Sequence, residues 1–176
     1  MRRQKHLCGI LAGIICLFPF SHIPAKAEIY WPSGPGVQAE AAVVMEASTG
    51  TVLYEKNPHE QLYPASITKI MTTLLALEHC GLEEEVTFSY ESVHNIDRNS
   101  THIFRDVGEI MTMEQCLYAV MLGSANDCAY AVAEHAGKGY ENFIAMMNDK
   151  AASLGCVDTH FNNPHGLTEE GHYTSA

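Results

Sequence analysis

Residues 64–69 (Pro-Ala-Ser-Ile-Thr-Lys) and the apolar run behind them constrain the fold more than any other stretch. From Ile70 onward the apolar residues recur at the spacing of one helix face, which predicts a buried helix beginning near Ser66. Pro64 fits the start of such a helix. Ser66 and Lys69 are then one turn apart on the same face.

This pair has the composition of a serine nucleophile with its base. A serine hydroxyl becomes nucleophilic when a base removes its proton, and a lysine can act as that base if its charge is disfavoured. The helix N-terminus would also favour an oxyanion forming at Ser66. Ser66 capping the helix, with Lys69 on the surface, would explain the same short pattern.

A second candidate group is Gly-Ser-Ala-Asn-Asp at residues 123–127, between two predicted helices. Ser124 could relay a proton, and the Asn126 amide could both donate to and accept from a peptide. Capping of the following helix by either residue is the alternative interpretation.

The remaining pattern predicts a mixture of strands and helices. Residues 41–47 and 51–55 flank a Ser-Thr-Gly turn and predict a hairpin. Thr112 and Gln115 have the spacing of a capping box that opens a helix. The other predictions are a helix end near Cys80 with Gly81 as its C′ residue, a strand within 85–90, a loop over 92–106, and helices over 126–136 and 140–154, the last burying Phe143, Ile144, Met147, Ala151 and Leu154.

The first 27 residues have the features of a secretory signal peptide. Three basic residues precede an apolar stretch over residues 7–20, and Ala25-Lys26-Ala27 provides a small-x-small cleavage pattern. Residues 28–40 are then a leader of low order, and residues 41–176 form one domain. Without residues 1–27, six Lys and Arg face 21 Asp and Glu, a net charge of −15, which argues against nucleic acid and anionic membranes as partners.

No cofactor or metal is expected from the sequence. Four cysteines follow the signal peptide, and none forms a Cys-x-x-Cys pair, which argues against a zinc or thioredoxin-like site. His94 and His102 fall in a polar loop, where solvated histidines are more common than metal ligands. These four cysteines are Cys80, Cys116, Cys128 and Cys156. They have apolar or small neighbours, so buried free thiols are favoured over disulfides. Four cysteines would allow three different sets of disulfide pairs.

Taken together, Ser-x-x-Lys at 66–69 and Ser-x-Asn at 124–126 resemble the penicillin-recognising serine enzymes. More closely, the chain is similar to the serine-type D-alanyl-D-alanine carboxypeptidases, the low-molecular-mass penicillin-binding proteins of peptidase family S11. Matching stretches also include residues 143–155 and 159–167. The resemblance implies an α+β, serine β-lactamase-like fold, here represented by its helical region and the N-terminal hairpin of an antiparallel sheet.

The resemblance also implies roles for individual residues. Ser66 would be the acylated nucleophile, Lys69 its base, Ser124 a proton relay and Asn126 a substrate-binding residue. The substrate would be the D-Ala-D-Ala end of peptidoglycan stem peptides outside the cytoplasm, and β-lactams would be inhibitors. His165 lies in a loop that is structural in the family, and no carboxylate partner for a classical triad is evident.

One departure from the family pattern is the missing third motif, Lys-Thr-Gly, because the only Thr-Gly here lies in the predicted hairpin. The chain stops at Ala176, so we expect it to be truncated, without a membrane anchor, and to acylate poorly by itself. Without the lysine of that motif, we expect Lys69 to stay protonated, with a pKa near the free value of about 10.4.

Two other functions remain as alternatives. An inactive fragment or wall-binding homologue would also lack the third motif. A β-lactamase would need a Glu in the loop after Ser-x-Asn to activate the deacylating water. Residues 155–167 contain Asp158 but no Glu, and Glu169 and Glu170 follow in a different context, so the carboxypeptidase is preferred.

Overall fold

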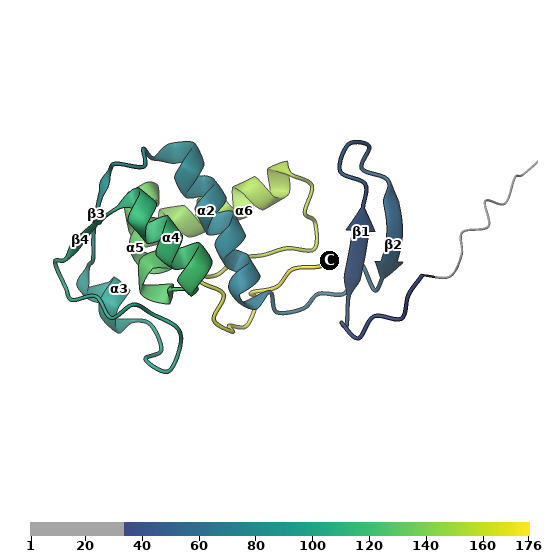
Figure 1. The fold of residues 1–176 in the computed structure, drawn as a ribbon, viewed down its shortest axis with the longest axis horizontal. Helices are drawn as coiled ribbons and strands as arrows, with labels where there is room; N and C mark the ends of the chain where they lie inside the picture. Colours follow the sequence, from purple (N-terminus) through teal and green to yellow (C-terminus); the bar gives the residue numbers. More distant parts are fainter. Residues whose placement is uncertain (1–33) are drawn as a thin grey trace, which may run out of the picture. The chain divides into compact units, whose positions relative to one another are not determined.

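The computed structural model describes residues 34–176 (Figure 1). The predicted signal peptide over 1–27 and the first part of the predicted leader therefore lie outside the described residues. Residues 34–40, the rest of the leader, contain no helix or strand, and residues 36–176 form one unit. Within the described range, every helix is too short or too polar to cross a membrane.

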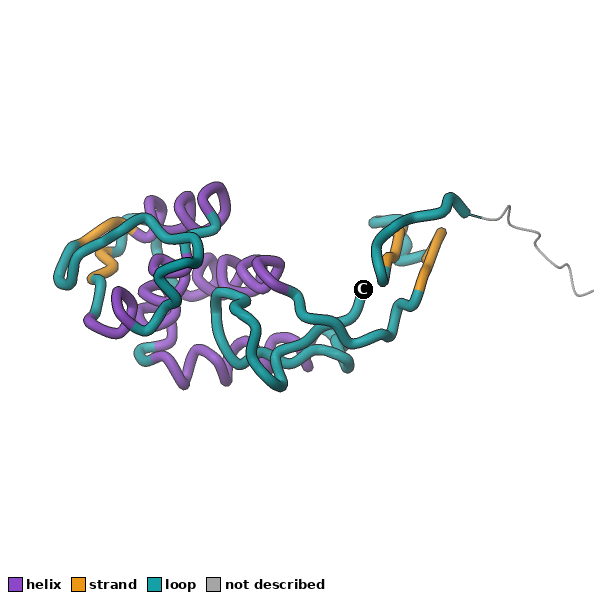
Figure 2. Tube along the Cα trace, turned by 90° about the horizontal axis from the view of Figure 1, so that it is seen from below, coloured by secondary structure: helices purple, strands orange, loops and turns teal. Residues whose placement is uncertain are grey.

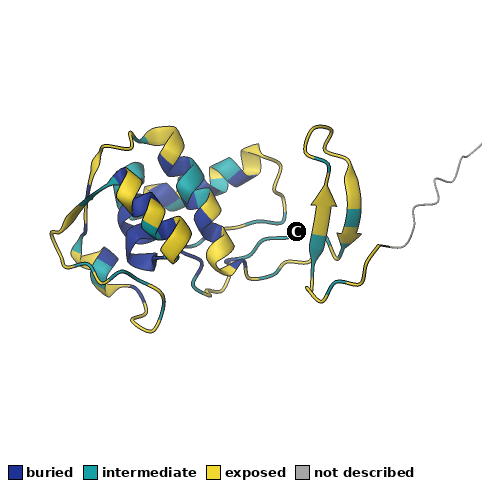
Figure 3. Cartoon of the chain, in the orientation of Figure 1, coloured by how far each residue is buried: buried dark blue, intermediate teal, exposed yellow. Residues whose placement is uncertain are grey.

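The predicted hairpin is confirmed. Strands β1 (Ala42–Met45) and β2 (Val52–Lys56) pair antiparallel, with Ala42 opposite Lys56. The turn is held by the Glu46 carboxylate, which accepts hydrogen bonds from the backbone N–H groups of Ser48 and Thr49 at 3.1 and 2.7 Å. Apolar side chains on both strands are exposed, as the colouring of Figure 3 shows: Val43, Val44, Met45, Val52 and Leu53.

The helix predicted near Ser66 is also present. It starts as a 3-10 turn, η2 (Ala65–Ile67), and continues as α2 (Thr68–His79). Gly81 does not form the left-handed cap expected of a C′ glycine, because Cys80 leaves the helix in an extended conformation. The Gly81 N–H instead donates to the Glu84 carboxylate at 2.7 Å, in a turn that leads to the next strand.

Two short elements were missed in the segment between α2 and the capping box. Strand β3 (Glu85–Thr87) lies within the predicted 85–90 range, but its partner β4 (Ile110–Thr112) was not predicted. Helix α3 (Tyr90–His94) occupies the start of the predicted loop, capped by Ser89, whose hydroxyl accepts from the Ser92 N–H. Elements of three to five residues are too short for a periodic pattern to show.

Three longer helices follow, α4 (Met113–Gly123), α5 (Asn126–Gly137) and α6 (Tyr140–Ser153). The capping box at the start of α4 is confirmed, with Thr112 and Gln115 each bonding the other's backbone N–H. Helix α5 contacts α2, α4 and α6, and Figure 2 shows these helices gathered together. Its buried residues include Ala129, Val132 and Ala133.

Two predictions about burial are wrong. Leu154 was expected in the core but is 58% exposed, and Cys156 was expected to be buried but is exposed. Both flank Gly155, whose φ of 80° ends α6 and turns the chain along the surface. Cys116 and Cys128 are buried as predicted, Cys80 is half-buried, and all four are free thiols.

Candidate active site

The three side chains predicted for catalysis meet at the Ser66 hydroxyl. Ser66 lies on η2, Lys69 in the first turn of α2, and Ser124 directly after α4. Lys69 Nζ donates to Ser66 Oγ at 3.2 Å, and Ser124 Oγ donates to the same oxygen at 2.8 Å. Residues 58 positions apart are thus brought into direct contact, within reach of proton transfer.

The capping alternatives do not describe these residues. The N-cap of η2 is Pro64 and that of α2 is Ile67, and neither makes a side-chain cap. Helix α5 begins after Ala125, which has no polar side chain to cap it. The hydroxyls of Ser66 and Ser124 are therefore directed to each other.

Lys69 is held in a site that disfavours its charge. Its side chain is only 2% exposed, and Nζ also donates to the backbone carbonyl of His165 at 2.6 Å. Burial lowers the pKa of Lys69 to about 8. The expectation of a pKa near that of a free lysine was wrong, because it assumed that a second cation was needed to lower it.

The carbonyl of His165 belongs to a C-terminal segment that packs along the start of α2. Thr72 Oγ1 donates to the Pro164 carbonyl at 2.6 Å, and Thr68 Oγ1 is 2.9 Å from His172 Nε2. Both threonines are fully buried. Sequence reasoning missed these contacts, because nothing in the pattern relates residues about a hundred positions apart.

His165 contributes through its backbone while its imidazole stays neutral. Burial, followed by the nearby charges of Lys69 and His172, lowers the pKa of His165 to about 3. Its Nδ1 accepts from the Leu167 N–H at 3.2 Å. A neutral, enclosed imidazole of this kind cannot shuttle protons near pH 7. The structure therefore gives the His165 side chain a structural role.

Two non-glycine residues with left-handed backbone conformation lie at the serine pair. Ala65 and Ser124 have φ values of 49° and 54°, in the left-handed region that non-glycine residues rarely adopt. Gly166 packs directly against Ala65, and a Cβ at Gly166 would lie 1.8 Å from the Ala65 carbonyl oxygen. Such strain persists only where the surrounding structure enforces it, and it is frequent at active sites.

Asn126 has one unused hydrogen-bonding atom. Its Nδ2 donates to Ser100 Oγ at 2.9 Å, and the residue is 4% exposed. Within the described part of the chain, its Oδ1 is buried without a hydrogen-bond partner. A buried acceptor left unpaired is costly, and a peptide N–H would satisfy it.

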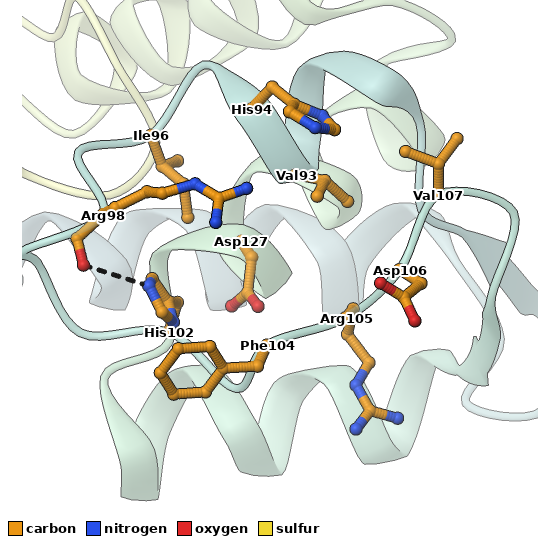
Figure 4. A pocket seen from close by; sticks show the side chains of 10 residues that line it. All are labelled: Val93, His94, Ile96, Arg98, His102, Phe104, Arg105, Asp106, Val107 and Asp127. Atoms are coloured by element: carbon orange, nitrogen blue, oxygen red, sulfur yellow. Dashed lines mark hydrogen bonds between the residues drawn. The ribbon is translucent and has the colours of Figure 1, made fainter.

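A separate pocket lies under the loop that precedes β4. Figure 4 shows Arg98, His102, Phe104 and Asp127 around it, with His102 bonded to the Arg98 carbonyl. Its volume is about 180 Å³, which is smaller than ligand pockets of about 300–1,000 Å³. It does not include Ser66 or Lys69 among its lining residues, so the hydroxyl cluster is the better candidate for chemistry.

Known proteins match this chain over nearly its whole length. The sequence pattern of the family described as D-alanyl-D-alanine carboxypeptidase, peptidase S11, matches residues 29–176. D-alanyl-D-alanine carboxypeptidase DacF of Bacillus subtilis is 40% identical over 98% of this chain and 45% of its own length. DacC of Escherichia coli is 33% identical over 97% of this chain and 44% of its own.

Solved structures give the same result. Penicillin binding protein 6B from Escherichia coli has a TM-score of 0.77 and 29% identity, covering 84% of this chain and 49% of that one. DacD from Francisella tularensis has a TM-score of 0.76 and 29% identity, covering 86% of this chain and 37% of that one. The chain spans less than half of the length of each of these proteins and of the two curated relatives.

Proposed function

The chain belongs to the D-alanyl-D-alanine carboxypeptidase family of serine peptidases, with a penicillin-binding-protein fold of which it covers a part, and we propose that it acts through an acyl-enzyme on Ser66. The proposed reaction removes the terminal D-alanine from peptidoglycan stem peptides. Members of this family act on peptidoglycan outside the cytoplasm, and we propose that residues 1–27 direct this chain there.

The proposed mechanism uses the three side chains around Ser66 Oγ. Neutral Lys69 accepts the hydroxyl proton while Oγ bonds to the carbonyl carbon of the penultimate D-alanine. The C–N bond then breaks, and the leaving amine takes a proton through Ser124. Water next attacks the ester carbonyl and returns a proton to Ser66 Oγ, which releases the shortened peptide and restores the enzyme. Asn126 Oδ1 would accept a peptide N–H of the substrate.

The observation that carries this proposal is the buried lysine one turn from a serine that also contacts Ser124. A purely binding homologue has no need to bury a lysine or to join two hydroxyls at 2.8 Å. A β-lactamase would need a carboxylate to activate the deacylating water, and among the described residues no carboxylate hydrogen-bonds to Ser66, Lys69 or Ser124. These contacts favour the carboxypeptidase over both alternatives.

The test of this function measures D-alanine release from a stem pentapeptide. Because the relatives are about twice as long, the test uses this chain and an extended protein that adds the remaining C-terminal part of the Bacillus subtilis relative. We expect the extended protein to release D-alanine and to stop after reaction with penicillin. We expect the chain alone to acylate about 100- to 1,000-fold more slowly, because in the family the strand with the third motif supplies one donor of the oxyanion hole, and the given sequence lacks that motif.

The control substrate is a pentapeptide ending in L-alanine, which should not be cleaved. Equal acylation rates from the two proteins would show that the third motif is dispensable. An extended protein that folds but neither releases D-alanine nor binds penicillin would contradict the proposed function.

The pH dependence of acylation follows from the lowered pKa of Lys69. Lys69 must be neutral to accept a proton, and its neutral form accumulates as the pH rises through about 8. We expect the acylation rate of the chain to rise about tenfold between about pH 7 and 9 and then level off. Single-turnover labelling with a fluorescent penicillin measures this, and a midpoint near pH 10 would contradict the assigned role of burial.

A further inference from the structure

A cysteine, a glutamate and a histidine meet at the ends of α2 and α5. One ligand atom from each of Cys80, Glu84 and His135 lies within 4.8 Å of the other two. We propose that these three side chains bind a divalent transition-metal ion, for which Zn²⁺ is the best match. This site lies outside the serine cluster and is independent of the proposed peptidase function.

The turn after α2 fixes two of the three ligands. Cys80 is the C-cap of α2, and its N–H remains bonded to the Ala76 carbonyl at 2.9 Å. The Glu84 N–H donates to the Gly81 carbonyl at 3.1 Å, and the Gly81 N–H donates to Glu84 Oε1 at 2.7 Å. One carboxylate oxygen is therefore held by the backbone of the turn, which leaves the other free to face a partner.

The third ligand comes from α5. His135 lies in the last turn of that helix, and its Nε2 is 2.8 Å from Glu84 Oε2. A histidine–glutamate pair alone would be an ordinary surface interaction, as the side chains are 27% and 48% exposed. The half-buried Cys80 thiol beside the pair distinguishes this group from a surface ion pair, because its sulfur is a soft ligand of the kind that transition metals such as zinc bind.

The donor set selects the class of metal. Zn²⁺ binds thiolate, imidazole and carboxylate with bonds of about 2.0–2.3 Å, so its ligand atoms lie roughly 3.3–3.8 Å apart. The observed atoms need to move by about an ångström to reach that geometry. Ca²⁺ and Mg²⁺ prefer oxygen ligands and fit poorly.

Three protein ligands leave one position of a tetrahedral ion for water, and the exposed side of the group gives that water access. The earlier expectation of no metal rested on the absence of a Cys-x-x-Cys pair. Here Cys80 and Glu84 are four residues apart on one turn, and His135 follows 51 residues after Glu84 on a helix. This spacing matches no recognised metal-binding motif. A bound ion would tie the end of α2 to the end of α5.

The experiment titrates the purified, untagged, reduced and metal-free chain with Co²⁺ and with Zn²⁺. We expect one ion per chain, a thiolate-to-Co²⁺ charge-transfer band, and a rise in Tm with Zn²⁺, since the ion binds the folded state. Cys80→Ser should remove the charge-transfer band. His135→Gln should weaken Zn²⁺ binding by more than tenfold, because loss of even an outer-shell partner of a metal ligand lowers metal affinity about 10–100-fold.

The matched controls are Cys156→Ser and His94→Gln, which change an exposed cysteine and an exposed histidine outside the proposed site. Both should bind Co²⁺ and Zn²⁺ as the unchanged chain does. The proposal is overturned if the unchanged chain binds neither ion, or if Cys80→Ser keeps the charge-transfer band and the affinity.

Discussion

Replacing Ser66 by alanine should abolish covalent labelling of the extended protein by a fluorescent penicillin, and replacing Lys69 by methionine should slow it by about 100- to 10,000-fold. In the proposed mechanism Ser66 supplies the oxygen that becomes acylated, so no other residue can substitute for it. Lys69 is the only basic side chain shown to contact that oxygen within the described residues. Methionine matches the length and apolar stem of lysine but cannot accept the proton.

The matched control for the lysine is Lys150→Met. Lys150 lies on α6 and pairs with Glu78 at 2.6 Å, away from the Ser66 hydroxyl. Its replacement should leave the labelling rate within about twofold, since a surface ion pair contributes little to stability. Thermal unfolding of each variant shows whether lost labelling comes from lost structure. Labelling that survives Ser66→Ala, or a Lys69→Met rate equal to that of Lys150→Met, would contradict the assignment.

Gly166→Ala should severely destabilise the folded chain. The new Cβ would lie 1.8 Å from the Ala65 carbonyl oxygen and 2.4 Å from its carbon, so backbone must move on one side or the other. Overpacking typically costs about 1–3 kcal/mol, and a left-handed conformation adds about 1–2 kcal/mol for a residue with a Cβ. We expect a loss of at least about 2 kcal/mol in the free energy of unfolding, and displacement of Ala65 should also misplace Ser66.

The control that separates these two costs is Gly108→Ala. Gly108 has a φ of 85°, against 86° at Gly166, but nothing lies within 4 Å of where its Cβ would be. It should therefore lose only the conformational part of the stability. Denaturant unfolding of both variants gives the comparison. If Gly166→Ala were no less stable than Gly108→Ala, the close approach between the Gly166 segment and Ala65 would not exist in solution.

The sequence predicted those parts of the fold whose signals are local. The Thr112 capping box, the Ser-Thr-Gly hairpin turn and the apolar run after Lys69 each depend on residues a few positions apart. Strand β4 and helix α3 escaped prediction because they are short and take their stability from neighbours. Leu154 shows a different failure, since helical periodicity continued past the point where Gly155 ended the helix.

The candidate site divides in the same way. Spacing could place Ser66 and Lys69 on one helix face, and the family resemblance added Ser124 and Asn126. The sequence could not reveal that burial alone lowers the pKa of Lys69, because the groups that enclose this side chain come from the far end of the chain. The grouping of Cys80 with His135 was invisible for the same reason. Side chains that meet only through tertiary packing leave no local trace in a sequence.

The enclosure of Lys69 depends on contacts between residues that are far apart in the sequence. Its contact with His165, and those of Thr68 with His172 and Thr72 with Pro164, span 96, 104 and 92 residues. We expect such distant contacts to form after neighbouring helices such as α5 and α6 have paired. A partly folded chain can therefore hold its helices while Lys69 is still hydrated, fully charged and unable to activate Ser66. In the proposed mechanism, closure of these contacts lowers the pKa of Lys69 to about 8 and so increases the neutral fraction that can accept the Ser66 proton.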